Sequence, residues 1–292
     1  AARDSLSRFQ QECEACARLD HPNIVKLIRV GQIGPVPYLA MELVEGQDLD
    51  ALISADGPLE PRRAALLGVQ LAAAIAHAHA HDVLHRDVKP ANVLLHPERG
   101  ALLTDFGLAK VFGTGGGLSL TQSSDLLGSP AYMAPEQVEA DHERVGNRTD
   151  VYGLGATLYE ALSGQPPCWG ANLGEVFHKV VKVMPSRPSS HAPEVEPALD
   201  AICLKCLAKD PKDRYPSAEA VGEALQAYLE GRGTGSRGPR IAAALAGAGL
   251  TLLVGVLGVS ALQTKETPSE APSLAAASPA PSARGTPAGA TP

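Results

Sequence analysis

One polar loop in the first half of the chain constrains the fold more than any other feature. It reads HRDVKPAN over residues 85–92 and follows a long segment with helical spacing of apolar residues, 60–81. Pro61, in the first turn of that segment, costs no hydrogen bond, because the first N–H groups of a helix have no partner within it. Short apolar runs at 93–95 and 102–103 are typical of strands. We therefore expect the loop to connect a long helix to a pair of short strands.

The other apolar patterns place a little β structure early in the chain and helices later. Two runs with strand-like composition, 24–30 and 36–44, are joined through a turn at Gly34-Pro35. Residues 105–136 have no regular pattern and are expected to form a long loop. This order predicts an α+β fold with a mainly helical second half. Further helices are expected at residues 5–19, 47–54, 150–163, 173–181, 196–208 and 217–230.

The balance of charges argues against nucleic acid as a partner. The chain of 292 residues has 25 Lys and Arg against 32 Asp and Glu, a net charge of −7, whereas binding to phosphates requires a basic face.

The cysteines argue against a secreted disulfide scaffold, because the chain has only five of them and an odd number cannot all pair. We therefore expect a reducing compartment for residues 1–230. The two C-x-x-C pairs, 13–16 and 203–206, lie too far apart in sequence for a compact zinc module.

A stretch of 22 residues without charge, 241–262, is expected to form a transmembrane helix. At about 1.5 Å rise per residue it spans about 33 Å, enough for a hydrocarbon core of about 30 Å. Arg232, Arg237 and Arg240 precede the stretch and only Lys265 follows closely, so the positive-inside rule places the preceding residues in the cytoplasm. This arrangement predicts a single-pass membrane protein.

The segments on either side of this stretch have biased compositions. Residues 231–240 are a Gly/Arg linker, and residues 263–292, rich in Pro, Ala, Ser and Thr, are expected to form a flexible extracytoplasmic tail. Small residues in the apolar stretch permit helix pairing, so a homodimer is an open alternative.

Four side chains in and after the polar loop supply the groups that phosphoryl transfer requires. The transition state of this reaction is loose, so catalysis consists mostly of positioning and charge neutralisation. Asp87 has a carboxylate that can orient an attacking hydroxyl, and Lys89 has a cation that can meet the phosphate charge. Asn92 and Asp105 provide the hard oxygen ligands that Mg²⁺ prefers.

The order of motifs is similar to that of the eukaryotic-like (Hanks-type) serine/threonine protein kinases. HRDVKPAN at 85–92 is followed by DFG at 105–107 and APE at 134–136, and together these motifs are very specific at such intervals. The resemblance covers about residues 3–230, and the following linker, span and tail are similar to those of bacterial receptor-type members. The resemblance implies a protein-kinase-like fold, ATP and Mg²⁺ (with Mn²⁺ as an alternative ion) as cofactors, and protein Ser or Thr hydroxyls as substrates.

By this resemblance the four polar residues have separate roles. Asp87 is the catalytic base and Lys89 contacts the γ-phosphate. A lysine two residues after the base points to Ser/Thr rather than Tyr substrates. Asn92 and Asp105 hold the metal ion.

The resemblance also implies where the nucleotide binds. The backbone of Glu42 and Val44 in the hinge would bond the adenine edge. Leu94 would pack below the adenine, and Asp48 would reach the ribose. Glu12 matches the helix glutamate that pairs with the ATP-positioning lysine.

Further residues are implied to support the site. Ser129 stands where the family usually has Thr and would bond Asp87. Glu136 would form a structural ion pair with Arg214, and Asp150 would brace the catalytic loop from its helix.

Arg86, next to the catalytic base, marks the subclass that is usually activated by phosphorylation of the activation loop. A phosphate there would gain charge-assisted bonds to Arg86 and order the segment. Thr121 and Ser123 are preferred among the candidates, which are Thr114, Ser119, Thr121, Ser123 and Ser124.

The resemblance also assigns packing rather than metal binding to other residues. Cys16, one turn after Glu12, is expected to pack against Phe106. Histidines before this loop are ordinary in the family, so no metal is expected at His77, His79, His81 and His85.

Two family features are missing from the chain. Neither a Gly-rich phosphate loop nor a strand lysine precedes Glu12. We therefore expect a fragment of an active kinase whose first strands lie upstream, and poor transfer by the chain as given. A membrane-anchored pseudokinase that binds partners without catalysis is the alternative, and the second lobe of a split enzyme is a third. The expected domains are a partial N-lobe at 1–45 and a C-lobe at 46–230, followed by the linker, span and tail.

Overall fold

The structure, a computed structural model, describes residues 15–34, 36–106 and 129–232. All of them belong to one unit of the chain, residues 1–236. Within these described ranges, no helix combines the length and the apolar character that a membrane crossing requires. The stretch 241–262 lies outside them.

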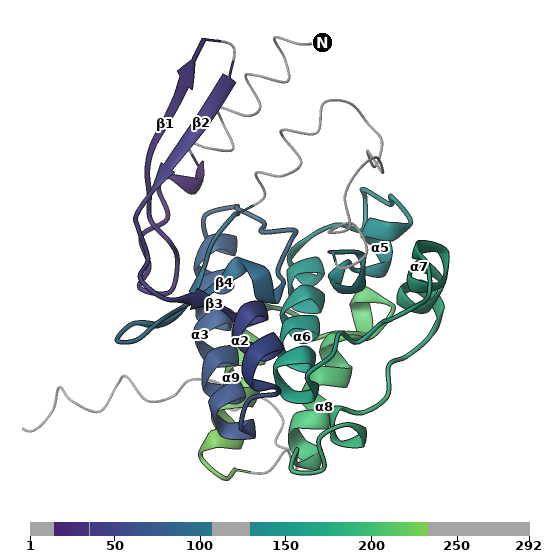
Figure 1. Cartoon of the computed structure of the whole chain (residues 1–292). Coiled ribbons are helices and arrows are strands. Elements are labelled where there is room, and N and C mark those ends of the chain that lie inside the picture. The colour runs from purple at the N-terminus through teal and green to yellow at the C-terminus, as the bar shows by residue number, and fades with distance from the viewer. Residues whose placement is uncertain (1–14, 35, 107–128, 233–292) are drawn as a thin grey trace, which may run out of the picture. The chain divides into compact units, whose positions relative to one another are not determined.

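An antiparallel hairpin is the first complete element (Figure 1). Strand β1 (Leu27–Ile33) pairs with β2 (Val36–Met41), with an irregularity in register between Leu27 and Arg29. Gly34 in the turn has a φ of +59°, a left-handed conformation that glycine adopts without a steric penalty. The sequence predicts this hairpin and its turn, although the first strand begins three residues later than expected.

A second sheet has three short strands in the order β3–β4–β5, all antiparallel. Strand β3 (Gln47–Asp48) pairs with β4 (Val93–His96), which pairs with β5 (Gly100–Leu103). The chain before β1 reaches the free edge of β5, where the Val25 N–H donates to Leu103 O at 2.9 Å. The expected helix at 47–54 therefore begins only after β3.

The other regular elements of the described chain are helices, and the long ones agree with the predicted helices within a few residues. In α3, Pro61 opens the helix, and the Glu60 side chain accepts the N–H groups of Arg62 and Arg63, both at 2.9 Å. The helices are α2 (Leu49–Asp56), α3 (Pro61–His79), α5 (Pro135–Val138), α6 (Asn147–Ser163), α7 (Leu173–Lys182), α8 (Pro197–Cys206) and α9 (Ala218–Leu229). Four 3₁₀ turns accompany them: η1 (Pro90–Asn92), η3 (Ser129–Tyr132), η4 (Pro188–Ser190) and η5 (Pro211–Asp213).

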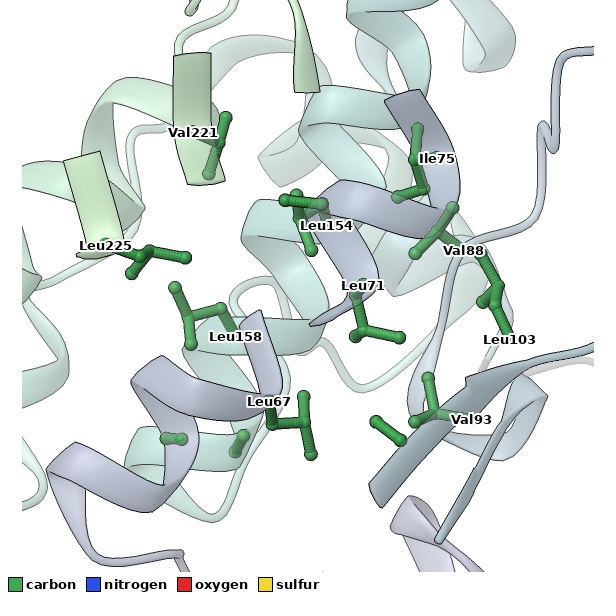
Figure 2. Close-up of a cluster of buried hydrophobic side chains, with 14 of the residues drawn as sticks. Leu67, Leu71, Ile75, Val88, Val93, Leu103, Leu154, Leu158, Val221 and Leu225 are labelled. Atoms are coloured by element: carbon green, nitrogen blue, oxygen red, sulfur yellow. The ribbon is translucent and has the colours of Figure 1, made fainter. Parts of the chain in front are cut away.

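The main hydrophobic core lies where α3, α6 and α9 pack together (Figure 2). Leu71 and Ile75 of α3 are fully buried, as is Leu225 of α9. The core continues to the loop after α3 through Val88, which is 2% exposed. Burying this apolar surface is the main stabilising contribution to the fold.

Helix α6 is buried on every side, from Thr149 to Ser163, and touches the polar loop directly. A Cβ at Gly153 would lie 2.9 Å from the Val88 Cβ and 3.0 Å from the Val88 carbonyl oxygen. Such contacts are too short for any other residue, so a glycine here lets the helix approach the loop backbone. The core helix thus fixes the position of the loop that carries the candidate catalytic residues.

Candidate active site

The loop from His85 to Asn92 is held by a buried neutral histidine. His85 is fully buried, its Nδ1 accepts the Asp87 N–H at 3.2 Å, and its Nε2 donates to Thr104 O at 2.8 Å. This use of both ring nitrogens requires the neutral tautomer with the proton on Nε2. Burial lowers the pKa of His85, against the opposing effect of Asp150, so the ring stays neutral. The ring of Phe106 packs against it at 4.6 Å between centroids.

Asp150, in the first turn of α6, braces the same loop. Its two carboxylate oxygens accept the backbone N–H groups of His85 at 2.8 Å and of Arg86 at 2.6 Å. The carboxylate is 1% exposed and also contacts His79 Nε2 at 2.7 Å. Arg86 has a φ of +65°, which costs a non-glycine residue free energy, so the bonds to Asp150 hold a strained backbone. The contact with the loop agrees with the role that the resemblance implies for Asp150, whereas no motif indicates His79 as its partner.

Asp87, Asn92 and Lys89 meet at one point of the loop. The Asn92 Nδ2 donates to Asp87 O at 2.8 Å and to Asp87 Oδ2 at 3.1 Å, and Lys89 Nζ lies 2.8 Å from the same Oδ2. Within the described part of the chain, no hydrogen bond engages the side-chain oxygen of Asn92. The structure therefore brings together three of the four residues to which the sequence assigns the chemistry.

Asp105, the fourth, is placed by the strand that precedes it. The Thr104 N–H donates to Asn92 O at 3.0 Å. This bond places Asp105, the next residue after Thr104, close to Asn92, the other predicted metal ligand. Asp105 is exposed, and its φ of +60° is again left-handed. An ionised carboxylate and an amide oxygen fit the oxygen preference of Mg²⁺. The residues present thus fit the metal that the resemblance implies.

Two of the predicted nucleotide residues lie opposite each other in the second sheet. Asp48 of β3 is the register partner of Leu94 of β4, and both are half-buried. One oxygen of Asp48 has a second use, since Oδ1 accepts the Ala51 N–H at 2.7 Å and caps α2. The predicted bond from Asp48 to the ribose would therefore use the other oxygen, Oδ2.

The predicted hinge is fixed to the second sheet by an ion pair. Arg99 in the turn between β4 and β5 donates to both carboxylate oxygens of Glu42, each at 3.1 Å, and to Pro22 O at 3.2 Å. The bonds from Arg99 lower the pKa of Glu42, so the carboxylate stays charged. The resemblance implies only a backbone role for Glu42, and no motif indicates Arg99, which is 57 residues away. The half-buried Val44 follows, and its bond to adenine stays a prediction.

The segment that begins at Ser129 contacts the polar loop through α5. Gln137 Nε2 donates to Arg86 O at 2.8 Å, a contact that the sequence did not indicate. Glu136, next to it, forms a buried bidentate pair with Arg214, with two N···O distances of 2.8 Å. Ser129 begins η3, and its bond to Asp87 stays a prediction.

Several predicted residues lie outside the described ranges. These are Glu12 and the five candidate phosphorylation sites between Thr114 and Ser124. Cys16, at the start of the described chain, packs against the core, and its sulfur contacts Phe106 O at 3.8 Å. The expected packing of Cys16 with Phe106 is therefore present.

Comparison with known proteins gives the same family as the motifs. The protein kinase domain model matches residues 1–225. Serine/threonine-protein kinase PknB of Mycolicibacterium smegmatis is 38% identical over 229 residues, which are 77% of this chain and 36% of that protein. Serine/threonine-protein kinase PkaA of Streptomyces coelicolor is 41% identical over 244 residues, 82% of this chain and 43% of that protein. The chain thus spans less than half the length of these relatives.

A solved structure supports the fold. The crystal structure of Rad53 1–466 in complex with AMP-PNP superposes with a TM-score of 0.62 at 23% identity, covering 76% of this chain and 54% of that one. At this identity the likeness shows the fold alone, a small sheet followed by a helical lobe. Together with the family match, it leads to one conclusion: the chain belongs to the protein kinase family.

Proposed function

We propose that the protein transfers the γ-phosphate of ATP to Ser and Thr hydroxyls of other proteins. The observation that carries this proposal is the cluster of Asp87, Lys89 and Asn92, with Asp105 joined to it through the bond from Thr104 to Asn92. The catalytic side chains are all intact, which favours an enzyme over a binding module. The names of the relatives, serine/threonine-protein kinases, point the same way.

The residues of the cluster divide the work between them. Asp87 accepts the proton of the substrate hydroxyl. The hydroxyl oxygen forms a bond to the γ-phosphorus, and the bond from that phosphorus to the leaving ADP oxygen breaks. Lys89, whose Nζ lies 2.8 Å from Asp87 Oδ2, neutralises phosphate charge beside the base. Asn92 and Asp105 would hold Mg²⁺, which supplies further neutralisation of the phosphate oxygens.

We also propose that this activity belongs to a membrane-anchored protein with its kinase part in the cytoplasm. The supports are the uncharged stretch 241–262 and the arginines that precede it. A phosphate on Ser or Thr in the candidate segment 114–124 would then regulate the enzyme through Arg86. Pairing of the stretch 241–262 would join two copies, which favours autophosphorylation in trans.

One experiment tests both proposals in the full-length protein. Membrane and soluble fractions of expressing cells are incubated with radiolabelled ATP and casein, with and without excess EDTA. We expect label on phosphoserine and phosphothreonine, at about 1–100 s⁻¹, only in the membrane fraction and only without EDTA. No label on casein or on the protein itself would favour the pseudokinase. Label that resists EDTA would contradict the metal role of Asn92 and Asp105. Activity that stays in the soluble fraction would refute the proposed membrane anchor and leave the proposed kinase activity standing.

A further inference from the structure

Three histidine rings lie in contact between the end of α3 and the segment that precedes β1. The ring centroid of His77, in the last turn of α3, lies 5.2 Å from that of His21 and 4.5 Å from that of His81. Neighbouring rings are tilted by 36° and 42°. The His81 Nδ1–H donates to His77 O at 2.8 Å, which fixes the outer ring to the helix end. We call these three residues the histidine column.

His21 connects this column to the strand that leads to Asp105. Its Nδ1 accepts the Asn23 N–H at 3.1 Å. The Asn23 side chain donates to Ala101 O of β5 at 2.8 Å, and Asn23 O accepts the Leu103 N–H at 2.9 Å. Leu103 ends β5, two residues before Asp105, the predicted metal ligand. The column therefore supports the chain segment that pairs with β5 next to the nucleotide site.

The contacts of the column favour uncharged rings. A protonated His21 would lose the lone pair of Nδ1 that accepts the Asn23 N–H. The Nε2 atom of His77 is buried, and within residues 15–34, 36–106 and 129–232 it has no hydrogen-bond partner, so a charge placed there would be poorly solvated. Two charged rings at 5.2 Å would also repel each other. Protons therefore work against the packing of the column.

The charged groups around the column do not offset this effect. Burial lowers the pKa of His21, and the charge of His77 lowers it further. Among the described residues, no carboxylate raises this pKa. The cavity beside His21 is also lined by two acidic and two basic side chains, which come from its own segment, the hinge and the β4–β5 turn and pair with each other, Asp20 with Lys26 and Glu42 with Arg99. On the side of α3, the exposed Asp82 follows His81.

We propose that the histidine column is a proton-sensitive contact that regulates the nucleotide site: its neutral rings hold residues 21–25 on β5, and protonation at mildly acidic pH releases them and weakens Mg·ATP binding. The nucleotide part of this inference rests on the proposed kinase function. Its direction follows from linkage. The pKa of His21 in the fold lies below its unfolded value of 6.5, so its contribution is present above pH 6.5 and is lost as the pH falls toward the folded value.

Calorimetric titration of the full-length protein with Mg·ATP, at about pH 7.5 and about pH 5.5, tests this regulation. Between these pH values we expect wild type to lose at least about fivefold more affinity than His21→Asn or His77→Phe. Asparagine at 21 keeps an acceptor for the N–H two residues later, and phenylalanine at 77 keeps an aromatic ring, but neither takes up a proton. Protonation of ATP itself affects all variants equally.

An exposed histidine provides the matched control for this comparison. His178, on α7, is exposed, and His178→Asn should lose as much affinity as wild type at the lower pH. If His21→Asn and His77→Phe also lost as much as wild type, the inference would be overturned.

A second readout needs no nucleotide. As the pH falls from about 7.5 to about 5.5, the Tm of wild type should drop by about 2–4 °C relative to His21→Asn and His77→Phe, because only wild type carries the full column. If wild type binds no Mg·ATP at either pH, the proposed function fails, while the Tm comparison still decides whether the column senses protons. A Tm difference that does not change with pH would contradict the column as a proton-sensitive contact.

Discussion

Replacing Asp87 by asparagine is expected to lower kcat for phosphoryl transfer by about 10²–10⁴-fold, the usual contribution of a general base. The amide cannot accept the proton of the substrate hydroxyl, although its oxygen can still accept a bond from Asn92 or Lys89. The fold should survive, because the Asp87 N–H bond to His85 and the Asn92 bond to Asp87 O use backbone atoms. The measurement is the initial rate of label transfer by the full-length protein at saturating ATP and casein.

A matched control separates the charge change from the catalytic role. Asp82 is an exposed aspartate five residues earlier, and its φ of +59° is a conformation that asparagine tolerates. Asp82→Asn should transfer phosphate at the wild-type rate. If Asp87→Asn also kept that rate, Asp87 would not be the base.

Replacing Arg214 by alanine is expected to destabilise the fold by about 3–5 kcal/mol, the usual cost of leaving one charge of a buried pair uncompensated. The side chains of Arg214 and Glu136 are both fully buried. The guanidinium donates to Glu136 twice and to the carbonyl oxygens of Ala208, Arg148 and Lys209. Alanine would leave all of these acceptors without their donor. The measurement is the denaturant midpoint of unfolding at constant slope.

An arginine on the surface provides the control for this prediction. Arg144 is partly exposed and lies 3.8 Å from Glu139 and 3.6 Å from Asp210, in pairs that are open to solvent. Arg144→Ala should change the free energy of unfolding by less than about 1 kcal/mol, as for other surface pairs. Equal destabilisation by the two replacements would contradict the special role of the buried pair.

The sequence predicts those parts of the fold that depend on local patterns. Pro61 and the apolar spacing after it predict α3, and Gly34 predicts the hairpin turn. No local pattern predicts the two-residue strand β3, since its partners in β4 are more than 45 residues away and two residues carry no periodicity. The short helix α5 begins within the expected loop 105–136, because its place depends on contacts with Arg214 and Arg86 rather than on its own sequence.

The candidate site follows a similar division. Motif spacing identifies Asp87, Asn92 and Asp105, since their order along the chain is itself the signal. The contacts that support them join distant elements: Arg99 to Glu42 and His79 to Asp150. No local spacing predicts such pairs, because burial and three-dimensional packing decide which polar groups must satisfy each other.

Magnesium-dependent binding of ATP, measured by calorimetry on the full-length protein, tests most directly whether Asn92 and Asp105 form the metal–nucleotide site. Asp105→Asn removes the charge of one predicted ligand, and asparagine tolerates the positive φ found there. We expect this variant to lose at least about tenfold in affinity for Mg·ATP, about 1.4 kcal/mol, while Asp87→Asn binds like wild type. Equal Mg·ATP affinity in wild type and Asp105→Asn would contradict a metal–nucleotide site at Asn92 and Asp105.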